Sequence, residues 1–136
     1  MDYVVDWVKL QRDGLLVVTL SGPGDSTALK ALMDELEAAT LLGPIPILLD
    51  ESSFTAGRIS TLDLRHMAEW WRETQRLGGS QVAVIAPREV VFGLNRMFLL
   101  VAGIGGDGRL SVFRSRSEAL DWLGERRIGA LSSNKD

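Results

Sequence analysis

The chain has 136 residues, which is the size of one ordinary domain. Apolar residues make up 46% and charged residues 24% of it, so a normal hydrophobic core is expected rather than disorder. The net charge of −3 argues against a nucleic-acid-binding face, and the lack of cysteine excludes disulfides and cysteine metal sites. Neither a secretory signal nor a run of about 18 apolar residues is visible, so we expect a cytoplasmic protein that does not insert into membranes.

The amino-terminal part predicts two strands. Residues 3–10 alternate roughly between apolar and polar side chains, which is typical of a half-buried strand. Residues 12–14 read Arg-Asp-Gly, a sequence common in the turns of hairpins, and residues 15–20 form an apolar, β-branched run. We therefore expect the first two strands to be antiparallel neighbours.

Alternating helices and strands follow. Asp25 or Ser26 is expected to cap a helix that ends near Leu41, and the apolar residues 46–49 predict a buried strand. A second helix begins at Ser60 or Thr61, where Asp63 favours the positive helix end. The remaining elements are a strand at 81–86, a helix from Pro87 to about Val101, a strand at 110–114 and a short helix ending at Leu123.

This order, β-β-α-β-α-β-α-β-α, predicts the α/β class. Strand–helix units of this length imply parallel strands with right-handed crossovers. We expect a mostly parallel sheet of about five strands with helices mainly on one face. Residues 1–124 are predicted to form a single domain, and residues 125–136, which are poor in apolar side chains, a flexible tail.

Four segments of the chain resemble a known family. Residues 82–87 (VAVIAP), 92–98 (FGLNRMF), 111–114 (SVFR) and 118–123 (EALDWL) resemble the SpoIIAA-like branch of the STAS superfamily, which includes bacterial anti-sigma-factor antagonists. The resemblance implies a SpoIIAA-like β-α superhelix and a non-enzymatic interaction or regulatory role. It also implies a shape similar to that of lipid-carrying CRAL-TRIO domains.

Regulatory STAS domains carry a phosphorylated serine at the start of the second helix, in an Asp-Ser-Ser/Thr-Gly-type motif. That motif is absent here, and the equivalent position falls near Gly57 or Arg58, which have no hydroxyl group. No phosphate acceptor is therefore assigned from the resemblance.

The helix after Pro87 carries a candidate protein interface. It is apolar nearly all round, and a helical wheel places Phe92 and Leu99 opposite a second apolar set that we expect to face the sheet. Phe92 and Leu99, with Arg96 nearby, would then point outward and bind a second copy or another protein. The alternative is that exposed apolar residues need no partner, or that a loop or the tail covers them. The second apolar set is Val90, Leu94, Met97 and Val101.

The second helix adds one residue to this interface hypothesis. Trp70 lies more than about 100° round the wheel from the core stripe that contains Leu64, and tryptophan often dominates binding surfaces. The alternative is that Trp70 packs against a neighbouring helix. His66 lies on the same side, but without a placed nucleophile it predicts no catalysis.

The loop at 50–60 is the part of the chain richest in polar chemistry. It follows a predicted central strand and approaches a helix amino terminus, where anions are favoured. A small anion or polar ligand is one interpretation, and turn and cap hydrogen bonds are the other. The candidate ligand residues are Ser52, Ser53, Thr55, Arg58 and Ser60.

We therefore expect a non-enzymatic STAS-like module that binds itself as a homodimer or binds another protein. The alternative is a carrier of a small apolar ligand or lipid, with a pocket between the sheet and the helices that carry Trp71, Met97 and Phe98. No cofactor and no metal are expected, since the chain has one histidine and no cysteine.

Overall fold

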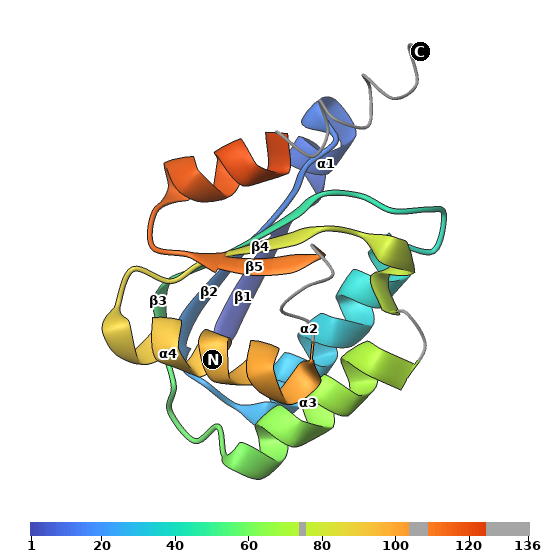
Figure 1. Ribbon diagram of the computed structural model, residues 1–136. Helices are drawn as coiled ribbons and strands as arrows, with labels where there is room; N and C mark the ends of the chain where they lie inside the picture. The colour runs from blue at the N-terminus through green and yellow to red at the C-terminus, as the bar shows by residue number, and fades with distance from the viewer. Residues whose placement is uncertain (74–75, 104–108, 125–136) are drawn as a thin grey trace.

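The computed structural model of the protein describes residues 1–73, 76–103 and 109–124. A five-stranded sheet with the order β1-β2-β3-β4-β5 forms its centre (Figure 1). β1 is antiparallel to β2, and all other neighbouring strands are parallel, which confirms the predicted mostly parallel sheet. The strands are β1 (Asp2–Asp6), β2 (Leu16–Pro23), β3 (Ile47–Thr55), β4 (Val82–Ile85) and β5 (Leu110–Phe113).

Helices cover both faces of the sheet, with most of them on one side (Figure 1). α2, α3 and α4 enclose the larger core, which contains Leu20, Leu32 and Trp71. A helical segment at residues 116–124 lies on the other face, where Ala119 and Leu123 pack against the sheet in a smaller core. The labelled helices are α1 (Trp7–Asp13), α2 (Ser26–Ala39), α3 (Thr61–Glu73) and α4 (Glu89–Ala102), with a 3-10 turn η1 (Arg76–Gly79) after α3.

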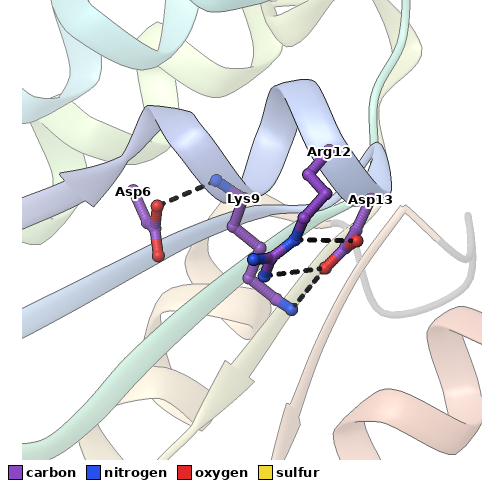
Figure 2. Close-up of polar contacts among 4 residues, drawn as sticks. All are labelled: Asp6, Lys9, Arg12 and Asp13. Atoms are coloured by element: carbon purple, nitrogen blue, oxygen red, sulfur yellow. Dashed lines mark hydrogen bonds and ion pairs between the residues drawn. The ribbon is translucent and has the colours of Figure 1, made fainter.

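The first connection differs from the prediction. The strand ends at Asp6 instead of Leu10, and α1 takes the place of a hairpin turn. The Asp6 carboxylate accepts a hydrogen bond from the Lys9 amide at 2.9 Å, and Lys9 forms an i,i+4 ion pair with Asp13 at 2.9 Å (Figure 2). Gly14 ends the helix in the left-handed conformation, with φ of 72°. The predicted antiparallel pairing of the first two strands is nevertheless confirmed.

The third strand is longer than predicted. β3 continues to Thr55 because β2 also continues to Pro23, and the two strands resume pairing after an irregularity between Thr19 and Ser21. The Arg88 guanidinium reinforces this extension by donating to the backbone carbonyls of Ser52 at 3.1 Å and Phe54 at 2.5 Å. Much of the segment predicted as a loop is therefore part of the sheet.

Two of the predicted helix starts are confirmed, whereas the helix predicted to begin at Pro87 begins at Glu89. Asp25 caps α2 by accepting from the Thr27 amide at 2.8 Å. Ser60 and Asp63 cap α3 reciprocally: Ser60 Oγ accepts from the Asp63 amide at 3.1 Å, and Asp63 Oδ2 accepts from the Ser60 amide at 2.9 Å. The tail predicted at residues 125–136 lies outside the described residues.

Candidate functional site

Helix α4 is rotated relative to the prediction: of the apolar set expected to face the sheet, Leu94 packs against the core, but Val90, Met97 and Val101 are exposed. Phe92 and Leu99 are half-buried and pack against the larger core, whereas Val90 is 73% and Met97 is 48% exposed. The expectation that Phe92 and Leu99 point outward is therefore wrong. Since α4 is apolar nearly all round, hydrophobicity alone could not choose its buried face.

Two polar contacts explain the observed orientation of α4. The Asn95 amide donates to Glu51 Oε1 at 2.7 Å and to the Val91 carbonyl at 2.9 Å, so the Asn95 side of the helix faces β3. The Arg114 guanidinium lies 4.1 Å from the Phe92 ring centroid, in cation–π geometry. Both contacts hold against the protein a side of α4 that the helical wheel predicted to face solvent.

The outward face of α4 carries an apolar strip that we call the α4 stripe. Leu100 is 82% exposed, and Gly93, near the middle, has no described atom within 4 Å of the position that a Cβ would occupy. The stripe thus combines protruding side chains with one flat position. Its members are Val90, Gly93, Met97, Leu100 and Val101.

The four residues predicted to form an interface do not share one surface. Arg96 is exposed beside the α4 stripe, but Phe92 and Leu99 belong to the core side of the same helix. Trp70 is half-buried on α3, against the larger core. The role of these residues in binding stays a prediction, and the exposed surface near them is the α4 stripe.

The hydroxyl-rich segment is used largely for local structure. Ser52 Oγ donates to Asp50 Oδ1 at 2.6 Å, and Ser60 caps α3. Ser53, Thr55 and Arg58 are exposed, the first two on β3. Turn and cap chemistry thus accounts for Ser52 and Ser60, and anion binding by this segment stays a prediction.

A partly open cavity lies between the sheet and helices α2, α3 and α4. Its volume is about 110 Å³, and its lining is almost wholly apolar. Trp71 and Phe98, which the carrier hypothesis placed at such a pocket, line it, whereas Met97 does not. Other apolar lining residues include Leu20, Leu32, Leu64, Val84 and Leu94.

Glu51 and Asn95 bring polar groups to this apolar cavity. Glu51, on β3, is only 9% exposed and lines the cavity together with Asn95 of α4. Burial is the main cause of a pKa of about 7 for the Glu51 carboxyl, against an ordinary 4.5. The hydrogen bond from Asn95 opposes this rise in pKa, and the negative charge of Asp50 adds to it.

Trp71 contributes an unused donor. Its side chain lines the cavity and is 5% exposed, and within the described residues its Nε1 has no hydrogen-bond partner. The Arg109 guanidinium lies 5.1 Å from the centroid of the Trp71 ring, a contact with the ring rather than with its N–H group. A buried donor without an acceptor is uncommon, because leaving it unpaired costs about 1–3 kcal/mol.

A surface groove of about 640 Å³ lies between α2 and α3. Ser26, Lys30, Asp34 and His66 give it polar walls. Four further residues line both the groove and the cavity, so they form a wall shared by the two spaces. These are Leu29, Met33, Met67 and Trp70.

Sequence reasoning did not single out Glu51 and Asn95. The signal was present but weak: Glu51 follows an apolar strand run by two residues, and Asn95 interrupts an otherwise apolar helical segment.

In the described part of the chain no group of three or more His, Asp or Glu side chains could hold a metal ion. Nor is any described helix both long and apolar enough to cross a bilayer.

Solved structures share this architecture. An anti-sigma factor antagonist from Mycobacterium paratuberculosis matches with a TM-score of 0.54 and 20% identity, over 90% of this chain and 92% of that chain. A protein of the DUF3478 family with a SpoIIAA-like fold, from Shewanella loihica, matches with a TM-score of 0.56 and 18% identity, over 89% and 93%. The chain has the SpoIIAA-like fold. No protein-family model and no curated protein sequence matches it.

Within this SpoIIAA-like fold, the place where the resemblance puts a phosphorylated serine is tightly packed. Gly57 has a φ of 55°, and a Cβ there would lie 2.5 Å from the Gly24 nitrogen and 2.7 Å from its carbonyl oxygen. Two hydrogen bonds join the same loops, from the Gly24 amide to the Thr55 carbonyl at 2.8 Å and from the Arg58 amide to the Gly24 carbonyl at 3.2 Å. This loop therefore requires glycine at the position where the resemblance would place a phosphorylated serine.

Proposed function

We propose that the chain is a non-enzymatic regulatory module that acts by binding a protein surface through the α4 stripe. One structural neighbour is an anti-sigma factor antagonist, a class named for its action on another protein. The observation that carries the proposal is the exposure of the stripe, with Leu100 at 82% and Val90 at 73%. Contiguous apolar side chains on a helix surface mark protein contacts more often than isolated ones do.

The spacing of the stripe favours a second copy of the chain as the partner. Val90 and Leu100 are centred on position 95, and so are Gly93 and Met97. If two α4 helices cross antiparallel about that point, Val90 of each copy faces Leu100 of the other, and Met97 faces Gly93. The flat surface at Gly93 then receives the Met97 side chain, as a self-complementary twofold interface requires.

We extend the proposal to a bacterial cytoplasmic setting. Both structural neighbours come from bacteria, and a chain without cysteine is compatible with a reducing compartment. The module is proposed to lack catalytic activity, because the perturbed carboxyl of Glu51 lies in an apolar cavity without a placed nucleophile among the residues described.

The homodimer is tested by Leu100→Glu. We expect the wild type to be dimeric at about 50 μM in sedimentation velocity, and the variant to dissociate at least roughly a hundredfold more readily. The reason is that a twofold interface loses the leucine twice, at about 2 kcal/mol for each buried side chain. Circular dichroism should show that the variant stays folded, because Leu100 lies outside the core.

Leu41→Glu is the matched control. Leu41 is 78% exposed but lies in the turn after α2 and is not part of the stripe, so its replacement should leave dimerisation unchanged. A monomeric wild type at 100 μM, or equal loss of the dimer in both variants, would contradict self-association through α4. Phe92→Glu and Leu99→Glu are less suitable, because both side chains pack on the core.

A further inference from the structure

We infer that the cavity between the sheet and helices α2, α3 and α4 is a binding site for a small apolar molecule that carries one hydroxyl group, of the phenol or short-chain alcohol class. This inference goes beyond the proposed interaction function, which uses the opposite side of α4. It depends on three observations: the size of the cavity, the polar groups in its wall, and the residues that separate it from the surface groove.

The size sets an upper limit on the ligand. An apolar cavity of about 150 Å³ in another protein stays dry and binds benzene. The cavity here, at about 110 Å³, suits a single ring or a chain of a few carbon atoms if the flexible side chains of its wall adjust slightly. A full-length lipid acyl chain would need the several hundred Å³ typical of larger ligand sites.

The wall groups set the chemistry of the ligand. Trp71 Nε1 is a buried donor without an acceptor among the described residues. Asn95 uses its amide hydrogens on Glu51 and on the Val91 carbonyl, and Glu51 keeps one carboxyl oxygen beyond that bond. Both Trp71 and Glu51 belong to the lining of the cavity. A hydroxyl group can accept from an indole N–H and donate to a carboxyl oxygen, whereas a hydrocarbon can do neither.

Charge in the wall favours a neutral ligand over an anion. Among the described residues that line the cavity, Glu51 is the only ionisable one; the neighbouring Asp50 is also acidic and is held by Arg116 at 3.4 Å, and the Arg109 guanidinium contacts the Trp71 ring. A carboxylate ligand would add a second negative charge to a desolvated space, which is strongly unfavourable. Benzoate is therefore expected to bind much more weakly than phenol.

The wall between cavity and groove supplies a route inward. Met33 and Met67 belong to this wall, and methionine side chains change conformation readily because they are unbranched. Leu29 and Trp70 complete the wall. Movement of these four side chains would connect the cavity to the groove between α2 and α3 without unfolding of the sheet.

The site is tested by titrating phenol, benzene and benzoate into the full chain labelled with nitrogen-15. The indole N–H resonance of Trp71, assigned with Trp71→Phe, should shift saturably with phenol at a dissociation constant on the order of 1 mM. The Trp122 resonance is the internal control, because Trp122 packs against the smaller core on the other face of the sheet. It should not move.

Variants separate the polar contact from simple filling of space. Trp71→Phe should weaken phenol binding about tenfold, as measured by displacement of a bound fluorinated benzene, and should leave benzene binding nearly unchanged. Leu32→Phe, which fills the cavity, should abolish both. Glu51→Gln, a second variant in the same wall, keeps a hydrogen-bonding group and should still bind phenol.

Three outcomes would overturn the inference. The first is the absence of a saturable Trp71 shift with either phenol or benzene. The second is equal movement of the Trp71 and Trp122 resonances, which indicates non-specific binding. The third is tighter binding of benzene than of phenol, which shows that the polar wall groups are not used. None of these results bears on dimerisation through the α4 stripe, so failure of this inference and failure of the proposed function are distinguishable.

Discussion

Replacing Glu51 with glutamine is expected to raise the free energy of unfolding by about 3 kcal/mol at pH 8 and to change it little at pH 4. Glutamine has nearly the same shape as the protonated carboxyl, and its oxygen can still accept from Asn95. It carries no charge that must be buried. The variant therefore isolates the cost of ionising Glu51 inside the apolar cavity.

The direction of the pH dependence follows from the two pKa values. The Glu51 carboxyl has a pKa of about 7 in the folded chain and an ordinary value of 4.5. Between these values the folded state holds more protons than the unfolded state, so wild-type stability falls as the pH rises from 4.5 to 7. At about 1.4 kcal/mol for each pH unit, the loss is nearly complete at pH 7 and amounts to roughly 3 kcal/mol.

Urea denaturation at pH 4, 5, 6, 7 and 8 measures this effect. The difference between Glu51→Gln and wild type should grow through that range and then level off. Glu69→Gln is the control, because Glu69 is an exposed glutamate on α3 whose replacement should give a small difference without this trend. A constant difference between Glu51→Gln and wild type at every pH would contradict the assignment of a buried, ionisable group.

Replacing Gly57 with alanine is expected to destabilise the fold by about 3 kcal/mol or more. The new Cβ would lie 2.5 to 2.9 Å from backbone atoms of Pro23 and Gly24, which cannot rotate away. Alanine would also have to adopt a φ of 55°, which favours glycine. Two separate costs therefore add at this position.

Gly14→Ala separates the two costs. Gly14 has a φ of 72°, but no described atom lies within 4 Å of its Cβ position, so only the backbone cost of about 1–2 kcal/mol is expected. Thermal and urea unfolding of both variants gives the comparison. If Gly57→Ala costs no more than Gly14→Ala, the contact between the loops after β2 and β3 is looser than described.

The Gly57 result bears on regulation. A serine at this position would bring the same Cβ as alanine, so the packing of Gly57 on Gly24 and a phosphorylatable hydroxyl exclude each other here. We therefore expect this chain to gain no phosphate on Gly57 or its neighbour Arg58. Any regulation of the proposed module would depend on another feature, such as occupancy of the cavity.

Local sequence patterns predicted much of the fold. Asp25 and the Ser60–Asp63 pair mark helix starts because their side chains bond amides within three residues, which needs no distant partner. Residues 82–86 form a run of apolar residues because β4 is buried between both helical layers. The strand–helix alternation that follows from such patterns indicated a mostly parallel sheet.

Patterns failed where two local structures suited the same residues. Residues 7–10 fit a strand by alternation, but the cap at Asp6 and the Lys9–Asp13 pair favour the helix α1. The hydroxyl-rich residues 52–55 resemble a loop, but pairing with an extended β2 makes them part of β3. In the first case a local cap and ion pair outweighed the alternation, and in the second case pairing with a strand distant in the sequence outweighed the loop-like composition.

By itself the sequence determined the order of most elements, the parallel character of the sheet and several helix caps, because each depends on spacing or on neighbours within one turn. The tertiary structure alone decided which side of α4 is buried, since an apolar helix offers no preference until Asn95 meets Glu51 across 44 positions of the chain. It also decided that Glu51 is enclosed with Trp71, whose N–H group has no acceptor among the described residues, because burial there depends on three helices that meet over the sheet.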